Sequence, residues 1–288
     1  MKKYLLTASL ILNCILLLVI YFVYQKPQAP EKRQIDGQSS YPYLSKRIFS
    51  ENQNDILINF IPLRTAMREY VEKQNGEVGV YFEYLPSGTS IGVNEKDEVT
   101  LASLIKTPLV MAVYRQLEEG KVKKDDILTI KKEELDQKFG DLWKTGEGTN
   151  LSVEEAIKLA LINSDNTAAN TLTSIIHPTA IDYVFDSLDI PTNKEGKITV
   201  ISPKSYSSIF RSLYLSSYLD QNSSNEILDI LTRTAFNDKI VAGVPNNIKV
   251  AHKIGVFDSA TNKQRAYSDC GIIYVPNRPY LLCVMAKA

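Results

Sequence analysis

Ser103-Leu104-Ile105-Lys106 is the stretch from which the rest of the chain can be understood, because it follows a strand-like segment and opens an amphipathic helix. In a helix, residues three positions apart lie on one face, one turn apart. The stretch therefore places a hydroxyl beside an amine. A serine hydroxyl becomes a nucleophile when a neighbouring base takes its proton. A lysine in a desolvated site can lose its own proton and become that base.

Two more short motifs follow in order along the chain. The triplet S-D-N occupies residues 164–166 after a helical stretch, and K-I-G occupies residues 253–255 at the end of a β-rich run. A literal K-T-G at residues 144–146 lies before the S-D-N in glycine-rich sequence, so we interpret it as a loop. Each motif alone is common by chance, and the hypothesis of a shared site depends on their order and context.

The predicted elements run as a β-hairpin, then helices, then a β-meander. Alternation predicts a hairpin from strands 78–84 and 89–93, and three further strands near the end of the chain. Helical spacing, Pro positions and a capping box at 152–155 predict the helices. The late strands are expected at 248–255, 266–275 and 279–287, and the helices at 53–74, 103–119, from 152, 166–175, 202–218 and 225–234. Joined into one antiparallel sheet, the β regions predict an α+β fold with helices at both chain ends and a helical subdomain.

These motifs resemble those of the penicillin-recognising serine enzymes, most closely the class A β-lactamases. The resemblance extends to the first hairpin at 77–88, to 159–172 around the S-D-N, and to the approach to the third motif at 240–253. It covers roughly residues 55–288 with all motifs in order. It implies an antiparallel sheet flanked by N- and C-proximal helices plus an all-helical subdomain, with the site in the cleft between them.

The resemblance implies a role for each polar motif residue. Ser103 would be the nucleophile, Lys106 the base for acylation, and Ser164 the relay of a proton to the leaving nitrogen. Asn166 would hydrogen-bond the substrate's amide and help to fix Lys106. Lys253 would place a positive charge near the substrate's carboxylate and lower the pKa of Lys106.

Backbone groups complete the expected site. The N–H groups of Ser103 and Val256 would form an oxyanion hole, and Gly255 would let the strand backbone approach the substrate closely. Asp165 would point away and hold the turn.

Structural roles remain open for the motif residues. Ser103 could be an ordinary serine at a helix start, Lys106 a surface lysine in a helix ion pair, and the S-D-N triplet a helix N-cap.

The chain departs from the family pattern at two points. Ile254 stands where the family has threonine or serine, so a hydroxyl that helps to bind a substrate carboxylate is missing. Between Ile175 and Ser202 no E-x-x-L-N pattern supplies the glutamate that positions a deacylating water, and Glu195 gives only a faint echo. General-base help is worth about 10²–10⁴-fold, so we expect an acyl-enzyme that turns over slowly.

The resulting hypothesis is a serine acyl-transfer hydrolase that opens β-lactam rings through a Ser103 acyl-enzyme. The alternatives are a D,D-peptidase-like enzyme acting on peptidoglycan stem peptides and a non-catalytic binding domain on the same fold. No cofactor is expected. His177 and His252 have no partner at ligand spacing, which gives no metal site. With 33 basic and 33 acidic residues, the charge balance gives no case for nucleic-acid binding, and we expect a monomer.

The N-terminal residues predict a membrane anchor. Lys2 and Lys3 precede an apolar run that continues to Tyr24, long enough at about 1.5 Å per residue to span a bilayer. The two lysines favour a cytoplasmic N-terminus and an extracytoplasmic domain. We therefore expect a transmembrane signal anchor at 1–24, a flexible tether at 25–50 and a catalytic domain at 51–288. A signal peptide cleaved before Glu31 and a lipoprotein site at Cys14 remain alternatives.

Two cysteines fall in the predicted β-meander. Cys270 and Cys283 are expected on adjacent antiparallel strands, where the register decides whether a disulfide can form. We interpret them as two buried free thiols that pack as small apolar residues.

Overall fold

The computed structural model describes residues 42–43, 59–195, 198–259 and 264–287, all within one compact unit, Tyr41–Ala288. No helix in these ranges is long and apolar enough to cross a membrane. The predicted anchor at 1–24 lies outside the described residues and stays a prediction. Of the predicted tether only Pro42 and Tyr43 are described. Tyr43 packs on the domain, donating from its hydroxyl to Asp229 over 3.1 Å.

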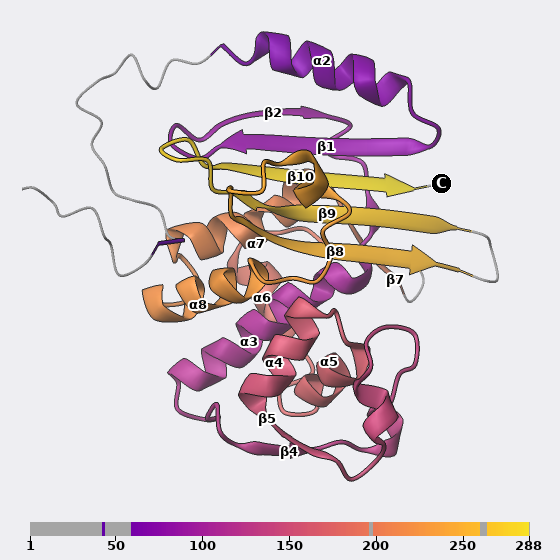
Figure 1. Cartoon of the computed structure of the whole chain (residues 1–288), viewed down its shortest axis with the longest axis vertical. Helices are drawn as coiled ribbons and strands as arrows, with labels where there is room; N and C mark the ends of the chain where they lie inside the picture. The colour runs from indigo at the N-terminus through magenta and orange to yellow at the C-terminus, as the bar shows by residue number, and fades with distance from the viewer. Residues whose placement is uncertain (1–41, 44–58, 196–197, 260–263, 288) are drawn as a thin grey trace, which may run out of the picture. The chain divides into compact units, whose positions relative to one another are not determined.

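Five antiparallel strands form the central sheet in the order β2-β1-β10-β9-β8 (Figure 1). The predicted hairpin is confirmed as β1 and β2, and the three late strands as β8 to β10. Their bounds are β1 Glu77–Tyr84, β2 Thr89–Val93, β8 Val250–Asp258, β9 Arg265–Ile273 and β10 Tyr280–Lys287. Strand β8 is the last strand of this order, so one side of its backbone faces away from the sheet.

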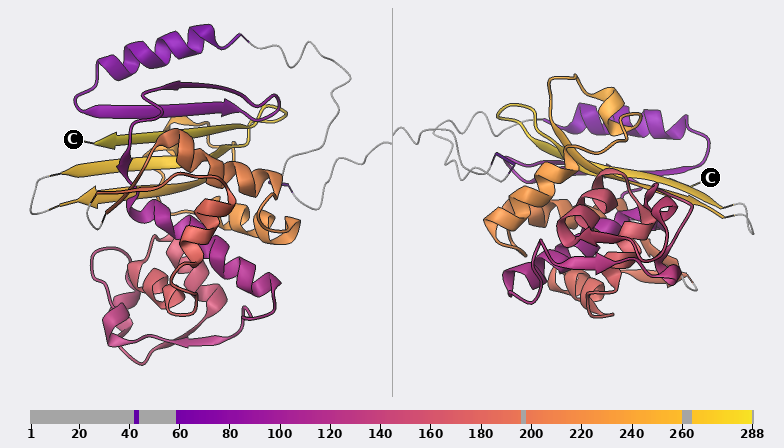
Figure 2. Two further views of the ribbon diagram at one scale, coloured as in Figure 1. Left: turned by 180° about the vertical axis from the view of Figure 1, so that it is seen from behind. Right: turned by 60° about the horizontal axis from the view of Figure 1, so that its bottom comes forward.

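Different layers of helices cover the two faces of the sheet (Figure 2), and alternate residues of β1 point to one layer or the other. On one side, Tyr81 and Glu83 point to helix α7, Pro203–Leu215. Arg211 of α7 donates from Nε to Glu83 Oε1 over 2.9 Å and from a terminal nitrogen to the Tyr81 hydroxyl over 3.0 Å. Because Glu83 is buried, this pairing satisfies a carboxylate inside the domain and ties α7 to the sheet.

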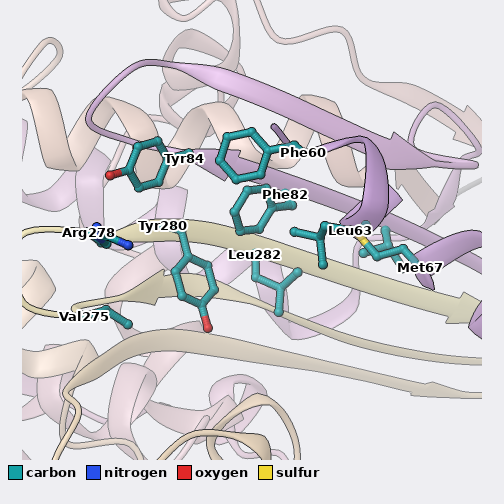
Figure 3. A pocket seen from close by; sticks show the side chains of 10 residues that line it. Phe60, Leu63, Met67, Phe82, Tyr84, Val275, Arg278, Tyr280 and Leu282 are labelled. Atoms are coloured by element: carbon teal, nitrogen blue, oxygen red, sulfur yellow. The ribbon is translucent and has the colours of Figure 1, made fainter. Parts of the chain in front are cut away.

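The other face of β1 packs loosely against helix α2, Ile61–Glu72. Val80 joins Val71 of α2 in a small second core. Beside it lies an apolar hollow of about 500 Å³, into which aromatic side chains such as Phe82 point (Figure 3). The hollow is lined from α2, β1, β10 and the turn before β10, and by none of the motif residues. It is therefore separate from the site that the sequence predicts.

The helical subdomain is built from α3, α4, α5 and α6, which are Lys106–Glu118, Val153–Ile162, Asn166–Thr173 and Ala180–Ser187. The predicted capping box at the start of α4 is present: Ser152 Oγ accepts from Glu155 N over 3.2 Å, and Glu155 Oε2 accepts from Ser152 N over 2.8 Å. Helix α4 is then followed almost at once by α5, and the S-D-N lies at that junction.

Several boundaries differ from the sequence-based expectation. The helix expected at 103–119 is a short 3₁₀ segment η2, Ala102–Ile105, followed by α3. The helix expected at 225–234 is α8, Gln221–Leu231, because Asp220 caps its start. Helix α2, before β1, confirms the expected helix at the N-terminal end, whereas the expected helix at the C-terminal end is wrong for the described residues, since β10 follows the last of the helices. Three short pairings were not predicted: β3 Val99–Thr100 with β7 Ile198–Ile201, β7 with β6 Asn193–Glu195, and β4 Ile127–Thr129 with β5 Asn150–Ser152.

The interpretation of Cys270 and Cys283 as free thiols is wrong, because the structure joins them in a disulfide. The register places the two residues directly opposite each other on β9 and β10, with Cα atoms 4.0 Å apart. Just beyond the ends of β8 and β9, Tyr274 N donates to Lys249 O. Cys270 is four residues before Tyr274 and therefore directs its backbone groups to the same side, toward β8. Cys270 and Cys283 are therefore a non-hydrogen-bonded pair, in which side chains approach most closely.

Removing this disulfide should destabilise the domain without changing its fold. A Cys270→Ala/Cys283→Ala variant is expected to lose about 3 kcal/mol of unfolding free energy, because the bridge closes a short loop in the unfolded chain. Urea denaturation of the domain measures this loss. Thiol titration of the unfolded wild-type domain serves as the control: two free thiols would contradict the pairing.

Candidate active site

Ser103 lies where the chain turns from strand β3 into helix α3. It is the second residue of η2, so its N–H has no partner within that helix. The turn is held on both sides, since Leu101 N donates to Thr199 O over 2.9 Å and the Tyr206 hydroxyl donates to Leu104 O over 2.9 Å. Ala102 has φ of 47°, a left-handed conformation that is costly for a residue with a Cβ. The hydroxyl of Ser103 is therefore presented by a fixed and strained turn.

Lys106 brings the first two motifs together. Its Nζ lies 3.0 Å from Ser103 Oγ, 3.1 Å from Ser164 Oγ and 2.6 Å from Asn166 Oδ1. Only 3% of the residue is exposed. The structure thus places the amine within proton-transfer distance of two serine hydroxyls.

Ser164 connects Lys106 with the third motif. Its hydroxyl also accepts a bond from Lys253 Nζ over 2.8 Å, so one oxygen contacts two lysine amines. The residue is fully buried, and its φ of 55° forms the break between α4 and α5. The backbone turn, rather than a helix, aims the side chain at both amines.

Asp165 points away from the amines and clamps the neighbouring loop. Its Oδ1 accepts from Ala168 N over 2.9 Å as the cap of α5, and its Oδ2 accepts from Leu142 N over 2.9 Å. Gly140 lies against this carboxylate: a Cβ at position 140 would be 2.0 Å from Asp165 Oδ2. The structure therefore gives Asp165 the N-cap role that remained open from the sequence.

Asn166 has both ends of its amide engaged. While Oδ1 accepts from Lys106, Nδ2 donates to Asp136 Oδ1 over 2.9 Å. Its backbone N donates to Phe139 O over 3.0 Å. Sequence reasoning missed Asp136, because a single acid in a loop carries no periodicity or motif that relates it to Asn166.

Lys253 is fully buried on strand β8, and its ammonium is directed inward. Besides Ser164 Oγ, Nζ contacts the carbonyl oxygen of Ile254 over 3.2 Å, and it lies 6.0 Å from the centroid of the Phe236 ring. Ile254 is only 2% exposed. Neither residue offers a free polar side chain to the surface of the site.

Gly255 lies against the turn that carries Ser103. A Cβ at this position would lie 3.1 Å from Leu104 Cγ and 3.3 Å from Leu101 O, so the close approach is to the turn that carries Ser103. The structure adds this role of making room for η2, and the approach of the strand backbone at Gly255 to a substrate stays a prediction. The absence of a side chain lets strand β8 lie directly beside the serine turn.

Val256 lies one residue further along the edge strand. In an antiparallel pair, every second residue bonds to the neighbouring strand through its backbone N–H and C=O groups. Lys249 bonds to the β9 side, and so do the residues at even spacing from it, such as Lys253 and Gly255. The residues between them, including Val256, direct their N–H groups away from the sheet. With β8 at the edge and η2 beside it, the N–H groups of Ser103 and Val256 both belong to the junction of these elements. An oxyanion hole formed by these two N–H groups stays a prediction.

Burial controls the charge of the two lysines. Desolvation lowers the pKa of Lys106 to about 8, although the carboxylates of Asp165 and Asp136 oppose the shift. Desolvation also lowers the pKa of Lys253 well below its usual value; repulsion by Lys106 adds to this effect, and Asp269 opposes it. Of the two expected causes of a low pKa at Lys106, desolvation is the one that acts, and the charge of Lys253 is not among the causes. Burial therefore favours the neutral form of both amines, and the two groups titrate as a coupled pair.

Both histidines have structural partners. His252 is fully buried, and its Nδ1 lies 2.8 Å from Asp269 Oδ1. His177 Nδ1 lies 2.8 Å from Thr179 Oγ1 in an exposed turn. In the described ranges no group of three or more metal-ligating side chains occurs.

A serine and a buried lysine at a helix start, beside the edge strand of an antiparallel sheet, define a penicillin-recognising type of serine enzyme. The chain belongs to the β-lactamase enzyme family, whose sequence profile matches residues 62–288.

Individual relatives agree with this assignment. A β-lactamase of Streptomyces albus G is 24% identical over 237 residues, covering 75% of this chain and 74% of the relative. A solved variant of PBP-A, an acyl-enzyme complex with penicillin G, superposes with a TM-score of 0.71 at 25% identity, covering 78% of this chain and 87% of that one. A β-lactamase of Chitinophaga pinensis DSM 2588 gives a TM-score of 0.71 at 25% identity over 78% of this chain and 90% of that one.

The contact between Gly140 and Asp165 can be tested with two alanine substitutions. Gly140 and Gly148 have φ of 87° and 82°, so alanine costs similar backbone strain at both. Only at 140 would the new Cβ meet another group within 4 Å. We expect Gly140→Ala to lose at least about 1 kcal/mol more unfolding free energy than Gly148→Ala. Equal losses in urea denaturation would show that the clamp does not stabilise the domain.

Proposed function

We propose that this protein is a serine acyl-transfer enzyme that opens β-lactam rings through a Ser103 acyl-enzyme and deacylates slowly. The observation that carries the proposal is the position of Lys106. Its amine is 3.0 Å from Ser103 Oγ, and burial brings its pKa to about 8. A base with a pKa near the working pH can both accept and return a proton.

The reaction follows from the contacts of the site. Ser103 Oγ attacks the carbonyl carbon of the cyclic amide, and its proton moves to Lys106 Nζ. The N–H groups of Ser103 and Val256 stabilise the oxygen that becomes negative. As the C–N bond breaks, the ring nitrogen takes the proton of Ser164 Oγ. Lys106, 3.1 Å from that oxygen, returns the proton it had accepted.

Slow deacylation is supported by the residues around the ester. In the described part of the chain, no carboxylate is hydrogen-bonded to Ser103 or Lys106. The partners of Lys106 Nζ are the hydroxyls of Ser103 and Ser164, the carbonyl of Ser164 and the amide of Asn166. Glu195, the faint sequence candidate, ends β6, and its side chain is not described. A PBP-A variant has been solved as a penicillin G acyl-enzyme, which is the intermediate that slow deacylation leaves behind.

The same acyl chemistry on a peptidoglycan stem peptide remains the second candidate, because no carboxylate among the described side chains is bonded to Ser103 or Lys106 as a water-activating base would be. In either case we place the domain outside the cytoplasm, held by an anchor at 1–24. The paired lysines and apolar run at the N-terminus support this placement. The disulfide between Cys270 and Cys283 is of a kind typical of oxidising compartments.

Intact-mass spectrometry tests the acyl-enzyme directly. The domain, residues 42–288, mixed with benzylpenicillin should gain the mass of one penicillin and keep it over many minutes, because the ester lacks an efficient base for hydrolysis. Ser103→Ala should gain none, whereas Ser87→Ala, a change in the exposed hairpin turn, should label like the wild type. Labelling of Ser103→Ala would rule out this nucleophile, and fast steady-state hydrolysis of a chromogenic β-lactam would rule out slow deacylation.

The pH dependence of acylation tests the role of Lys106. Only the neutral amine can take a proton, so the acylation rate constant should rise about tenfold per pH unit below pH 8 and level off above it. Lys106→Arg keeps the charge but cannot lose its proton, and should slow acylation by at least about 10²-fold. Lys144→Arg, a surface change in the K-T-G loop, should keep the wild-type profile. A flat profile in the wild type would exclude Lys106 as the base.

A further inference from the structure

Asp136 is a fixed acid beside the proposed site. Its Oδ1 accepts from Asn166 Nδ2 over 2.9 Å and from Lys138 N over 2.8 Å. Its own backbone N donates to Thr167 Oγ1 over 3.0 Å, which attaches the loop to helix α5. These bonds hold the half-buried carboxylate against the amide that also contacts Lys106.

The carboxylate of Asp136 is not neutralised by an ion pair. Within the described ranges, the salt bridges include no lysine or arginine paired with it, and its Oδ2 has no hydrogen-bond partner. Its charge nevertheless reaches the site, because it raises the pKa of Lys106 against the effect of burial. An unpaired carboxylate that is rigidly held and partly shielded from water is a favourable partner for a cation.

We propose that Asp136 forms a subsite for an ammonium group of the substrate, carried on the carbon next to the carbonyl that Asn166 binds. This inference rests on the proposed function. The Asn166 amide nitrogen has two hydrogens, of which one goes to Asp136 and the other remains for a substrate carbonyl. A substituent one bond away from that carbonyl would be close to the amide of Asn166, to which the Asp136 carboxylate is hydrogen-bonded.

The remaining charges of the site agree with a cationic substrate. Lys253 is fully buried and directed at Ser164, and the 2% exposed Ile254 offers no hydroxyl to an anion. The carboxylate of Asp165 is occupied by two backbone N–H groups. Of the charged motif residues and the charged hydrogen-bond partners of the motifs in the described chain, Asp136 is the one with an oxygen left for a substrate, and it selects acyl-amides with a free α-amine, either aminopenicillins or peptides.

Ampicillin and benzylpenicillin form a matched pair of probes, because they differ by one amino group on the carbon next to the side-chain carbonyl. The experiment measures the second-order acylation rate constant of each probe. The reaction is quenched at successive times, and the acylated fraction is determined by intact-mass spectrometry. We expect the ratio of ampicillin to benzylpenicillin to fall by about five-fold in Asp136→Asn, the upper range for a partly exposed ion pair. Asp141→Asn removes an exposed acid from the same segment, which is paired with Lys144, and should keep the wild-type ratio.

The ratio separates this role from a structural one. If Asp136 only orients Asn166, its replacement slows both probes alike and leaves the ratio unchanged, which would overturn the subsite. A ratio that falls equally in Asp136→Asn and Asp141→Asn would also overturn it, since the effect would be a general loss of negative charge. If the wild type is acylated by neither probe, the proposed function fails and the subsite fails with it.

Discussion

The contact on which the site depends is that of one serine hydroxyl with two buried amines. Ser164 Oγ lies 3.1 Å from Lys106 Nζ and 2.8 Å from Lys253 Nζ, and both lysines are almost completely removed from water. Burying two ammonium groups side by side is strongly unfavourable. The domain reduces the cost by lowering both pKa values, so that a proton is held loosely. The same instability makes a lysine useful as a base at neutral pH.

Holding this arrangement requires strained backbone and rigid supports. Ala102 and Ser164 have φ of 47° and 55°, and such residues persist where the surrounding structure over-determines them. One is fixed by the bond of Leu101 to Thr199 and the other by the Asp165 clamp. The sheet contributes its edge strand β8 to the site. Helices packed on the two faces of the sheet hold that strand in place. Much of the fold therefore serves to position one turn, one helix junction and one strand against each other.

The local elements of this site were predictable from the sequence, and its long-range contacts were not. The hairpin, the capping box at Ser152 and the late strands follow from spacing and caps that act within a few residues. The pairing of Cys270 with Cys283 depends on strand register, which spacing alone leaves open. The contact of Asp136 with Asn166 joins residues 30 positions apart through an irregular loop. The resemblance brought the three motifs together but carried no information about that loop.

Gly255 shows that a motif residue singled out from the sequence can have a second neighbour that only the fold reveals. The sequence indicates only that the backbone must come close to something at that position. The alternation of β8 puts Gly255 on the same face as Lys253, and the nearest atoms to an added Cβ belong to Leu104 and Leu101. A side chain there would push the serine turn away from the edge strand, and with it the Ser103 N–H away from the Val256 N–H. The glycine therefore acts on the distance between two backbone donors, which is the quantity that stabilisation of a developing oxyanion depends on.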